Sequence, residues 1–67
     1  MIYDDFQTLK PGTILTGSNG FYTYEYISLK DSILRVIPIF KNSNIKSRER
    51  QFTATPRFLE QFKIKLS

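Results

Sequence analysis

The sequence predicts a mainly β protein: a small, five-stranded, partly open barrel with one short helix or helical turn before the last strand. Aromatic and β-branched residues favour pleated, half-buried surfaces, and the chain has six Phe and four Tyr among 67 residues. Turn signals rich in Gly, Pro, Asn and Asp also recur at short intervals. We expect residues 1–67 to form a single small domain, in which residues 1–8 are a less ordered N-terminal arm.

The turn signals divide the chain into short extended segments. The Asn19-Gly20 pair favours a tight hairpin. Pro38 cannot donate a hydrogen bond to a neighbouring strand, so its strand should bend there or lie at an edge. The predicted turns are residues 10–13, 17–20 and 30–32. The predicted strands are residues 13–16, 21–29, 33–41, 51–55 and 63–67.

A short helix is predicted between the last two strands. Thr55 can cap its N-terminus and Pro56 suits its first position, so the pattern indicates a helix of about two turns. Its apolar face would consist of Phe58, Leu59 and Phe62.

Alternation in the final strand places Ile64 and Leu66 inward and the neighbouring lysines outward. Over roughly residues 9 to 66, this order of elements resembles the layout of SH3-like barrels, in which a short helical turn precedes the final strand. OB-folds are the alternative, although they usually need a longer chain.

The composition argues against catalysis and against bound cofactors. The chain has no Cys and no His, which excludes disulfides and leaves no ligand set typical of zinc or haem. The usual general base and the best nucleophile are therefore missing, and the glycines match no phosphate-binding motif. We expect a non-catalytic protein without a cofactor or a metal.

No signal peptide is visible at the N-terminus. The longest apolar stretch, residues 33–40, is too short to span a membrane and contains Arg35 and Pro38. A cytoplasmic protein that does not associate with a membrane is the expectation.

The segment FYTYEY places Tyr22, Tyr24 and Tyr26 at every second position of the longest predicted strand. If Ile27 and Leu29 face the core, the three tyrosines stand together on the outer surface, about 6–7 Å apart. Such a row could stack nucleobases or anchor a protein interface. Alternatively, the tyrosines pack across strands or fill the core with their hydroxyls at its rim.

A basic segment follows the third predicted strand. Residues 41–51 carry a local charge of +3, most of the formal net charge of +4. Its cations are Lys41, Lys46, Arg48 and Arg50. If the segment is extended, the last three project to the same side and could follow a phosphate backbone. Alternatively, it is a solvated loop, or its charges protect a sheet edge from pairing.

These features predict a small binding module. The preferred function is binding of DNA or RNA, with the tyrosines stacking on bases and the basic segment contacting phosphates. The alternative is a protein-binding adaptor or inhibitor that engages an acidic host protein, as a phage or mobile-element accessory protein would. Nucleic-acid binding requires the basic row and the tyrosines to share a face. A homo-oligomer is also compatible with so small a core.

Overall fold

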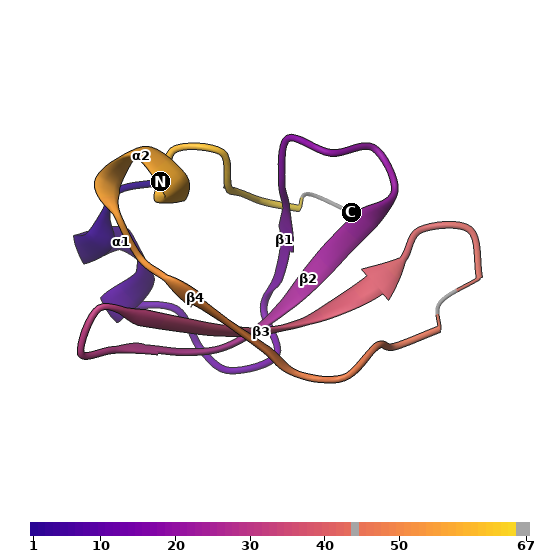
Figure 1. Ribbon diagram of the computed structural model, residues 1–67, viewed down its shortest axis with the longest axis horizontal. Coiled ribbons are helices and arrows are strands. Elements are labelled where there is room, and N and C mark those ends of the chain that lie inside the picture. The colour runs from indigo at the N-terminus through magenta and orange to yellow at the C-terminus, as the bar shows by residue number, and fades with distance from the viewer. Residues whose placement is uncertain (44, 66–67) are drawn as a thin grey trace.

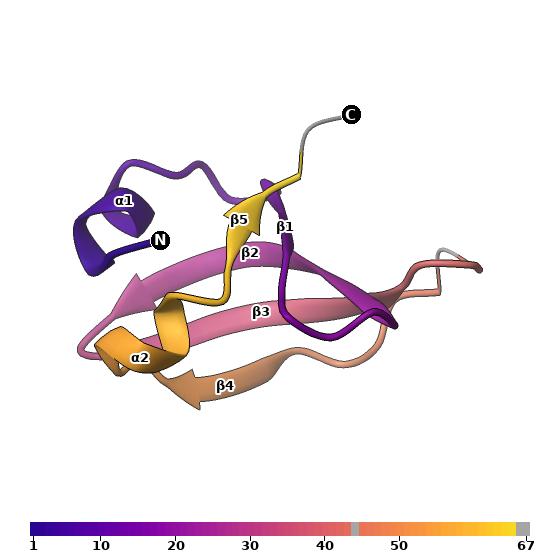
Figure 2. The ribbon, with the colours of Figure 1, turned by 90° about the horizontal axis from the view of Figure 1, so that it is seen from above.

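The computed structural model describes residues 1–43 and 45–65, and Figure 1 shows its arrangement. In chain order, the elements of this part of the chain are α1 (Tyr3–Gln7), β1 (Ile14–Thr16), β2 (Tyr22–Lys30), β3 (Ile33–Phe40), β4 (Arg50–Thr53), α2 (Pro56–Leu59) and β5 (Lys63–Ile64). The strands form one antiparallel sheet in the order β4-β3-β2-β1-β5, so β4 and β5 are its two edges (Figure 2). The mainly β fold, with an open sheet and a helix before the last strand, is therefore confirmed.

The sheet has a core face and an outer face. The core face carries Leu15, Leu34 and Val36, each with no exposed surface. Residues opposite each other on paired strands share a face, so Tyr24, which pairs with Leu15, also belongs to the core face. Both helices cover the same end of the core face, whereas the other end has no helix above it (Figure 1). We call these the covered end and the open end.

The N-terminal segment does not form the less ordered arm that was expected over residues 1–8. Tyr3–Gln7 form helix α1, and Phe6 has no exposed surface. Phe6 contacts the ring of Phe62 edge-on, with ring centroids 6.1 Å apart. Burial of this large apolar side chain offsets the entropy lost on ordering the segment, and the Met1 amino group adds hydrogen bonds to the carbonyls of Leu59 and Phe62, at 3.1 Å each.

Helix α2 begins as the sequence predicts. The Thr55 hydroxyl accepts a hydrogen bond from the Phe58 backbone N–H at 3.2 Å, and Pro56 is the first helical residue. The helix has only 4 residues, about one turn rather than two. Leu59 and Phe62 are buried as predicted, and Phe58 is half-buried beside them.

The β2–β3 hairpin closes at the predicted turn. Asp31 and Ser32 both have positive φ, 54° and 61°, which is the backbone of a type I′ turn. The prediction of a tight hairpin at Asn19-Gly20 is wrong. A longer loop, residues 17–21, joins β1 to β2. The Asn19 side chain supports this loop by accepting hydrogen bonds from the backbone of Phe21 and Tyr22.

Pro38 lies inside the sheet, opposite Tyr24 of β2. On its other side, β4 pairs with β3 only up to the Val36–Arg50 pair, and an isolated bridge joins Ile39 to Lys46. The missing Pro38 donor therefore coincides with an irregular stretch of the β3–β4 ladder, where the Pro38 carbonyl accepts from the Ser47 N–H at 2.8 Å, so Pro38 lies neither on an edge strand nor in a regular ladder.

The final strand is shorter and less buried than predicted. Ile64 pairs with Leu15 and so shares the core face, yet it is 47% exposed because β5 is an edge strand. The inward position predicted for Leu66 lies outside the described residues. Within residues 1–43 and 45–65, no helix has the length and apolar character needed to cross a membrane.

Candidate functional site

The tyrosine row lies on the core face, as the packing alternative predicts, and not on the outer surface, where it would stand if Ile27 and Leu29 faced the core together. Tyr26 is 4% exposed, and its hydroxyl donates a hydrogen bond to the Phe6 carbonyl at 3.0 Å. The reason is a bulge between Tyr26 and Ser28, where Ile27 is the additional residue. The bulge returns Leu29 to the tyrosine face, so Leu29 and the tyrosines share one core instead of pointing apart.

The three tyrosines do not have the same surroundings. Tyr26 belongs to the covered end, whereas Tyr22 and Tyr24 lie toward the open end and are half-buried. Tyr24 contacts the core ring of Phe62 edge-on, with centroids 5.6 Å apart. Tyr22 lies beside Phe40, which is 45% exposed, with centroids 4.7 Å apart. The row therefore passes from a buried core position to an accessible aromatic surface.

An open cleft of about 210 Å³ lies at this end of the sheet. We call it the aromatic cleft; it is lined by Asn19, Tyr22, Tyr24, Pro38, Ser47, Arg50 and Phe52. Its walls combine three aromatic rings and a proline with one guanidinium group. Typical pockets for drug-sized ligands are about 300–1,000 Å³, so this cleft suits one flat group better than a whole small molecule.

Sequence reasoning anticipated three of these residues, Tyr22, Tyr24 and Arg50. Phe52 could have been found, because it is the apolar member of an alternating segment. Asn19 and Ser47 carried no such signal, because each reaches the cleft through loop geometry.

Asn19 organises one wall of the aromatic cleft. Its Oδ1 accepts hydrogen bonds from the backbone N–H groups of Phe21 and Tyr22, at 2.9 and 3.0 Å. Its Nδ2 donates to the Tyr24 hydroxyl oxygen at 2.8 Å. The side chain of Asn19 thus ties the loop of residues 17–21 to a ring of the cleft.

The basic row predicted from Lys46, Arg48 and Arg50 does not form. Ile37 and Pro38 of β3 lie opposite Ser47, Arg48 and Glu49, one residue more, so the alternation slips between Lys46 and Arg50. Lys46 lies on the outer face, because it pairs with Ile39, and its Nζ is 2.8 Å from the Glu25 carboxylate. Arg50 is the cation of this row that lines the aromatic cleft.

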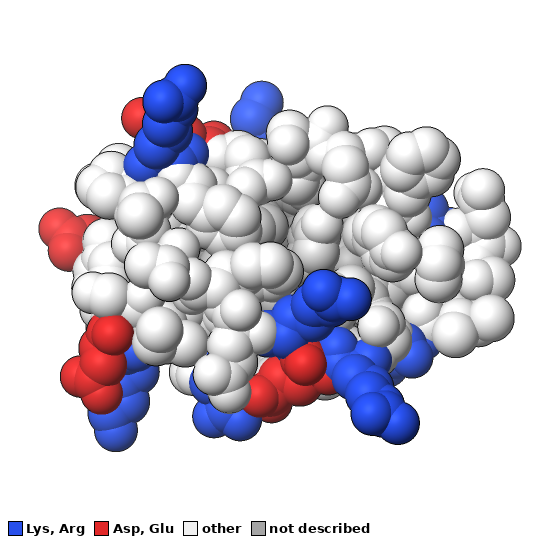
Figure 3. Space-filling view, in the orientation of Figure 1, with Lys and Arg blue, Asp and Glu red and all other residues white. Residues whose placement is uncertain are grey.

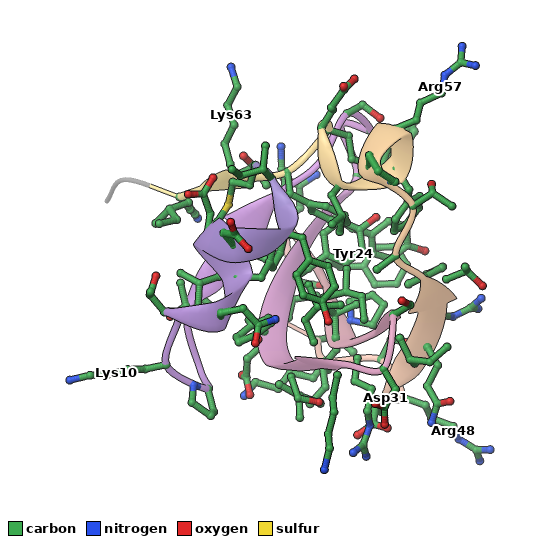
Figure 4. The ribbon with its side chains drawn as sticks, turned by 90° about the vertical axis from the view of Figure 1, so that its left-hand side faces the viewer. Lys10, Tyr24, Asp31, Arg48, Arg57 and Lys63 are labelled. Carbon is green, nitrogen blue, oxygen red and sulfur yellow. The ribbon has the colours of Figure 1, made fainter. Side chains whose placement is uncertain are left out.

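The remaining predicted cations lie at the margins of the molecule. The Arg48 side chain extends away from the body of the protein, whereas Tyr24 lies near its middle (Figure 4). Lys41 follows the last residue of β3, and its backbone N–H donates to the Phe21 carbonyl at 3.1 Å.

Within the described residues, basic and acidic side chains lie close together. In the part of the chain that the structure describes, the ion pairs are Lys46 with Glu25 and Arg35 with Glu49, at 2.8 Å each. On the face shown in Figure 3, most of the visible Lys and Arg side chains lie along the lower edge beside acidic side chains, and fewer lie at the top. Net charge alone therefore does not identify a site, and the aromatic cleft is defined by its shape and lining.

Two further clefts lie beside α1. One, of about 290 Å³, is lined by Ile2, Tyr3, Asp4, Ala54, Pro56, Leu59 and Glu60. The other, of about 430 Å³, is bordered by Asp5, Glu60 and Lys63 among other residues. Acidic side chains line both, which disfavours phosphate. No group of three acidic side chains that could hold a metal ion occurs within residues 1–43 and 45–65.

Comparison with known proteins gave no match, whether to a family model, a curated protein or a solved structure.

Proposed function

We propose that the protein is a cytoplasmic binding module for single-stranded nucleic acid and that the aromatic cleft is its binding site. The observation that carries the proposal is that Tyr22, Tyr24 and Arg50 line the same cleft. Of the basic row that was expected to share a face with the tyrosines, Arg50 alone lines the cleft, so the proposal rests on one cation beside the aromatic rings. Base stacking on aromatic rings contributes about 1–3 kcal/mol per base, and arginine suits contact with a phosphate.

The geometry favours single strands over a duplex. Tyr22 and Tyr24 are half-buried, so a base must leave its stack to reach them. Phe40, which neighbours Tyr22 and is 45% exposed, offers a second ring outside the cleft. A strand would then place one base in the cleft and the next against Phe40, with Arg50 beside the intervening phosphate.

Fluorescence anisotropy tests the proposal with labelled single-stranded DNA, single-stranded RNA and duplex DNA at about 50 and 200 mM salt. If Arg50 and Lys41, the residue that follows Phe40, each contact one phosphate, the log–log salt slope is expected to be near −1.4, with a roughly sevenfold loss of affinity over that range. Duplex DNA is expected to bind more weakly than either single strand.

Two arginine variants localise the binding. Arg50→Ala removes the cation of the cleft and is expected to weaken single-strand binding and to make the salt slope less negative by about 0.7. Arg57→Ala removes one positive charge from α2. The Arg57 side chain extends away from the sheet (Figure 4), so this variant is expected to leave the affinity unchanged. Equal losses from both variants would mean that net charge, and not the cleft, binds the strand. An absence of binding at the lower salt would contradict the proposal.

A second candidate function is recognition of an acidic protein. The observation that favours it is a set of exposed apolar side chains at the open end: Phe21 is 74%, Ile45 61% and Phe40 45% exposed. Exposed aromatic residues are typical anchors of protein interfaces. This function would be favoured if the protein binds no nucleic acid and if the wild type captures a protein partner that the Phe40→Ala variant does not bind.

A further inference from the structure

The hydroxyl of Tyr24 takes part in a hydrogen bond whose direction can be assigned. The Asn19 amide must present its oxygen to Phe21 and Tyr22, because both partners there are backbone N–H groups and only an oxygen can accept from them. Its nitrogen therefore faces Tyr24, at 2.8 Å from the hydroxyl oxygen. An amide nitrogen donates and cannot accept, so Tyr24 is the acceptor in this bond.

The Asn19 bond is the one hydrogen bond that the Tyr24 hydroxyl makes among the described residues, so its hydrogen is not donated there. Tyr26 provides the contrast within the same row, because its hydroxyl hydrogen is donated to the Phe6 carbonyl. Tyr24 lines the aromatic cleft together with Asn19, so its free hydrogen is available to a molecule in the cleft.

We infer that Asn19 positions Tyr24 as a hydrogen-bond donor to an acceptor oxygen of the strand bound in the aromatic cleft. The identity of the ligand rests on the proposed function, whereas the direction of the bond rests on the Asn19 contacts alone. In a nucleic acid the acceptor is either a phosphate oxygen or a base carbonyl. Together with Arg50, Tyr24 makes the polar lining of the cleft rich in donors, which suits such an oxygen.

The direction of the bond is tested first in the free protein. Tyr24→Phe removes the acceptor of the Asn19 amide, so the side-chain amide protons of Asn19 are expected to move upfield in the NMR spectrum. Tyr3→Phe removes the same atom from α1, at the covered end, and is expected to leave those signals in place. Unchanged Asn19 signals in Tyr24→Phe would overturn the inference.

Binding of oligo-dT and of an abasic strand of equal length then tests the donor role. Tyr24→Phe keeps the ring and loses one hydrogen bond, which predicts a loss of affinity of about 3- to 30-fold, against less than twofold for Tyr3→Phe. A loss on both strands assigns the acceptor to the sugar–phosphate backbone, and a loss on oligo-dT alone assigns it to a base carbonyl. If Tyr24→Phe binds both strands as the wild type does, the inference is wrong and the proposed function stands. If the wild type binds neither strand, both are wrong.

A double-mutant cycle separates the hydrogen bond from charge. Asn19→Asp keeps an acceptor for the two backbone N–H groups but introduces a carboxylate that takes the Tyr24 hydrogen. Its negative charge repels the strand in any background, whereas loss of the donor matters only where Tyr24 is present. We therefore expect Asn19→Asp to cost more affinity in the wild type than in Tyr24→Phe. Equal costs in the two backgrounds would contradict the inference.

Discussion

The covered end and the open end of the core face are built from the same strands and the same types of aromatic residue, yet only one of them is a closed core. Tyr26, at the covered end, lies near Phe6 of α1, and its hydroxyl is used within the fold. Tyr22, on the same strand, lies beside Phe40 at the surface. The difference comes from the two helices, which lie over one end only (Figure 1).

This comparison indicates how a chain of this size can be both stable and able to bind. Its net stability is expected to be about 3–5 kcal/mol, so few residues can be spared from the core. Two helical turns close one half of the sheet, and the other half keeps its aromatic rings accessible.

The largest expected effect separates two phenylalanines. Phe62 is 1% exposed and contacts the rings of both Phe6 and Tyr24, so Phe62→Ala should cost about 3–5 kcal/mol and leave much of the protein unfolded. Phe40→Ala, at the open end, removes one surface ring pair and should cost about 1 kcal/mol. Urea unfolding followed by circular dichroism measures both, and similar losses would mean that the open end is part of the structural core.

The next effect concerns tyrosine hydroxyls in one row. Tyr26→Phe removes one of two donors to the Phe6 carbonyl, which still accepts from the Leu9 backbone N–H at 3.2 Å, and should lower the free energy of unfolding by about 0.5–1.5 kcal/mol. Tyr22→Phe removes a hydroxyl that has no hydrogen-bond partner within the described residues, so the unfolding free energy should stay the same. Chemical denaturation of the two variants decides this; a loss in Tyr22→Phe as large as in Tyr26→Phe would show that the row is uniformly structural.

Alkaline pH should act through the same buried hydroxyl. Burial raises the pKa of Tyr26 above its ordinary value of 10.0, and the nearby Tyr3 adds to the rise. The folded state thus favours the neutral phenol. Its contribution is fully present below the pKa of the unfolded chain and is lost as pH rises through the higher pKa of the folded state. Unfolding measured between about pH 9 and 12 should show stability falling more steeply in the wild type than in Tyr26→Phe. Parallel curves would contradict this assignment.

Local features of the fold could be predicted from the sequence because they depend on neighbouring residues. The turn at Asp31-Ser32 and the cap at Thr55 are of this kind, and both form where the sequence indicates them. The face that β2 buries could not be predicted. Both of its faces carry apolar side chains, and a single bulged residue, Ile27, decides whether Leu29 opposes the tyrosines or joins them.

The candidate site could be predicted only in part for a similar reason. Tyr22, Tyr24 and Arg50 were identified from residue type and alternation, and they do share the aromatic cleft. Lys46 was assigned to the same side, but the extra residue opposite Pro38 turns it to the outer face. Register is set by pairing between distant segments, and the composition of the basic segment carries no information about it.

The smallest expected effect tests this displacement of Lys46. In the Lys46–Glu25 pair the lysine side chain is 59% exposed and the glutamate side chain 23%, so solvent screens the pair. A double-mutant cycle of Lys46→Ala and Glu25→Ala should give a coupling of only about 0.2–1 kcal/mol, which weakens in 1 M salt. The backbone bond from Ser47 N–H to the Pro38 carbonyl, at 2.8 Å, should hold the segment in place without the pair. Lys46→Ala should therefore leave the affinity for single strands within about twofold of the wild type, because its ammonium group faces away from the aromatic cleft. A loss as large as that of Arg50→Ala would place Lys46 on the path of the strand and would extend the binding surface onto the outer face.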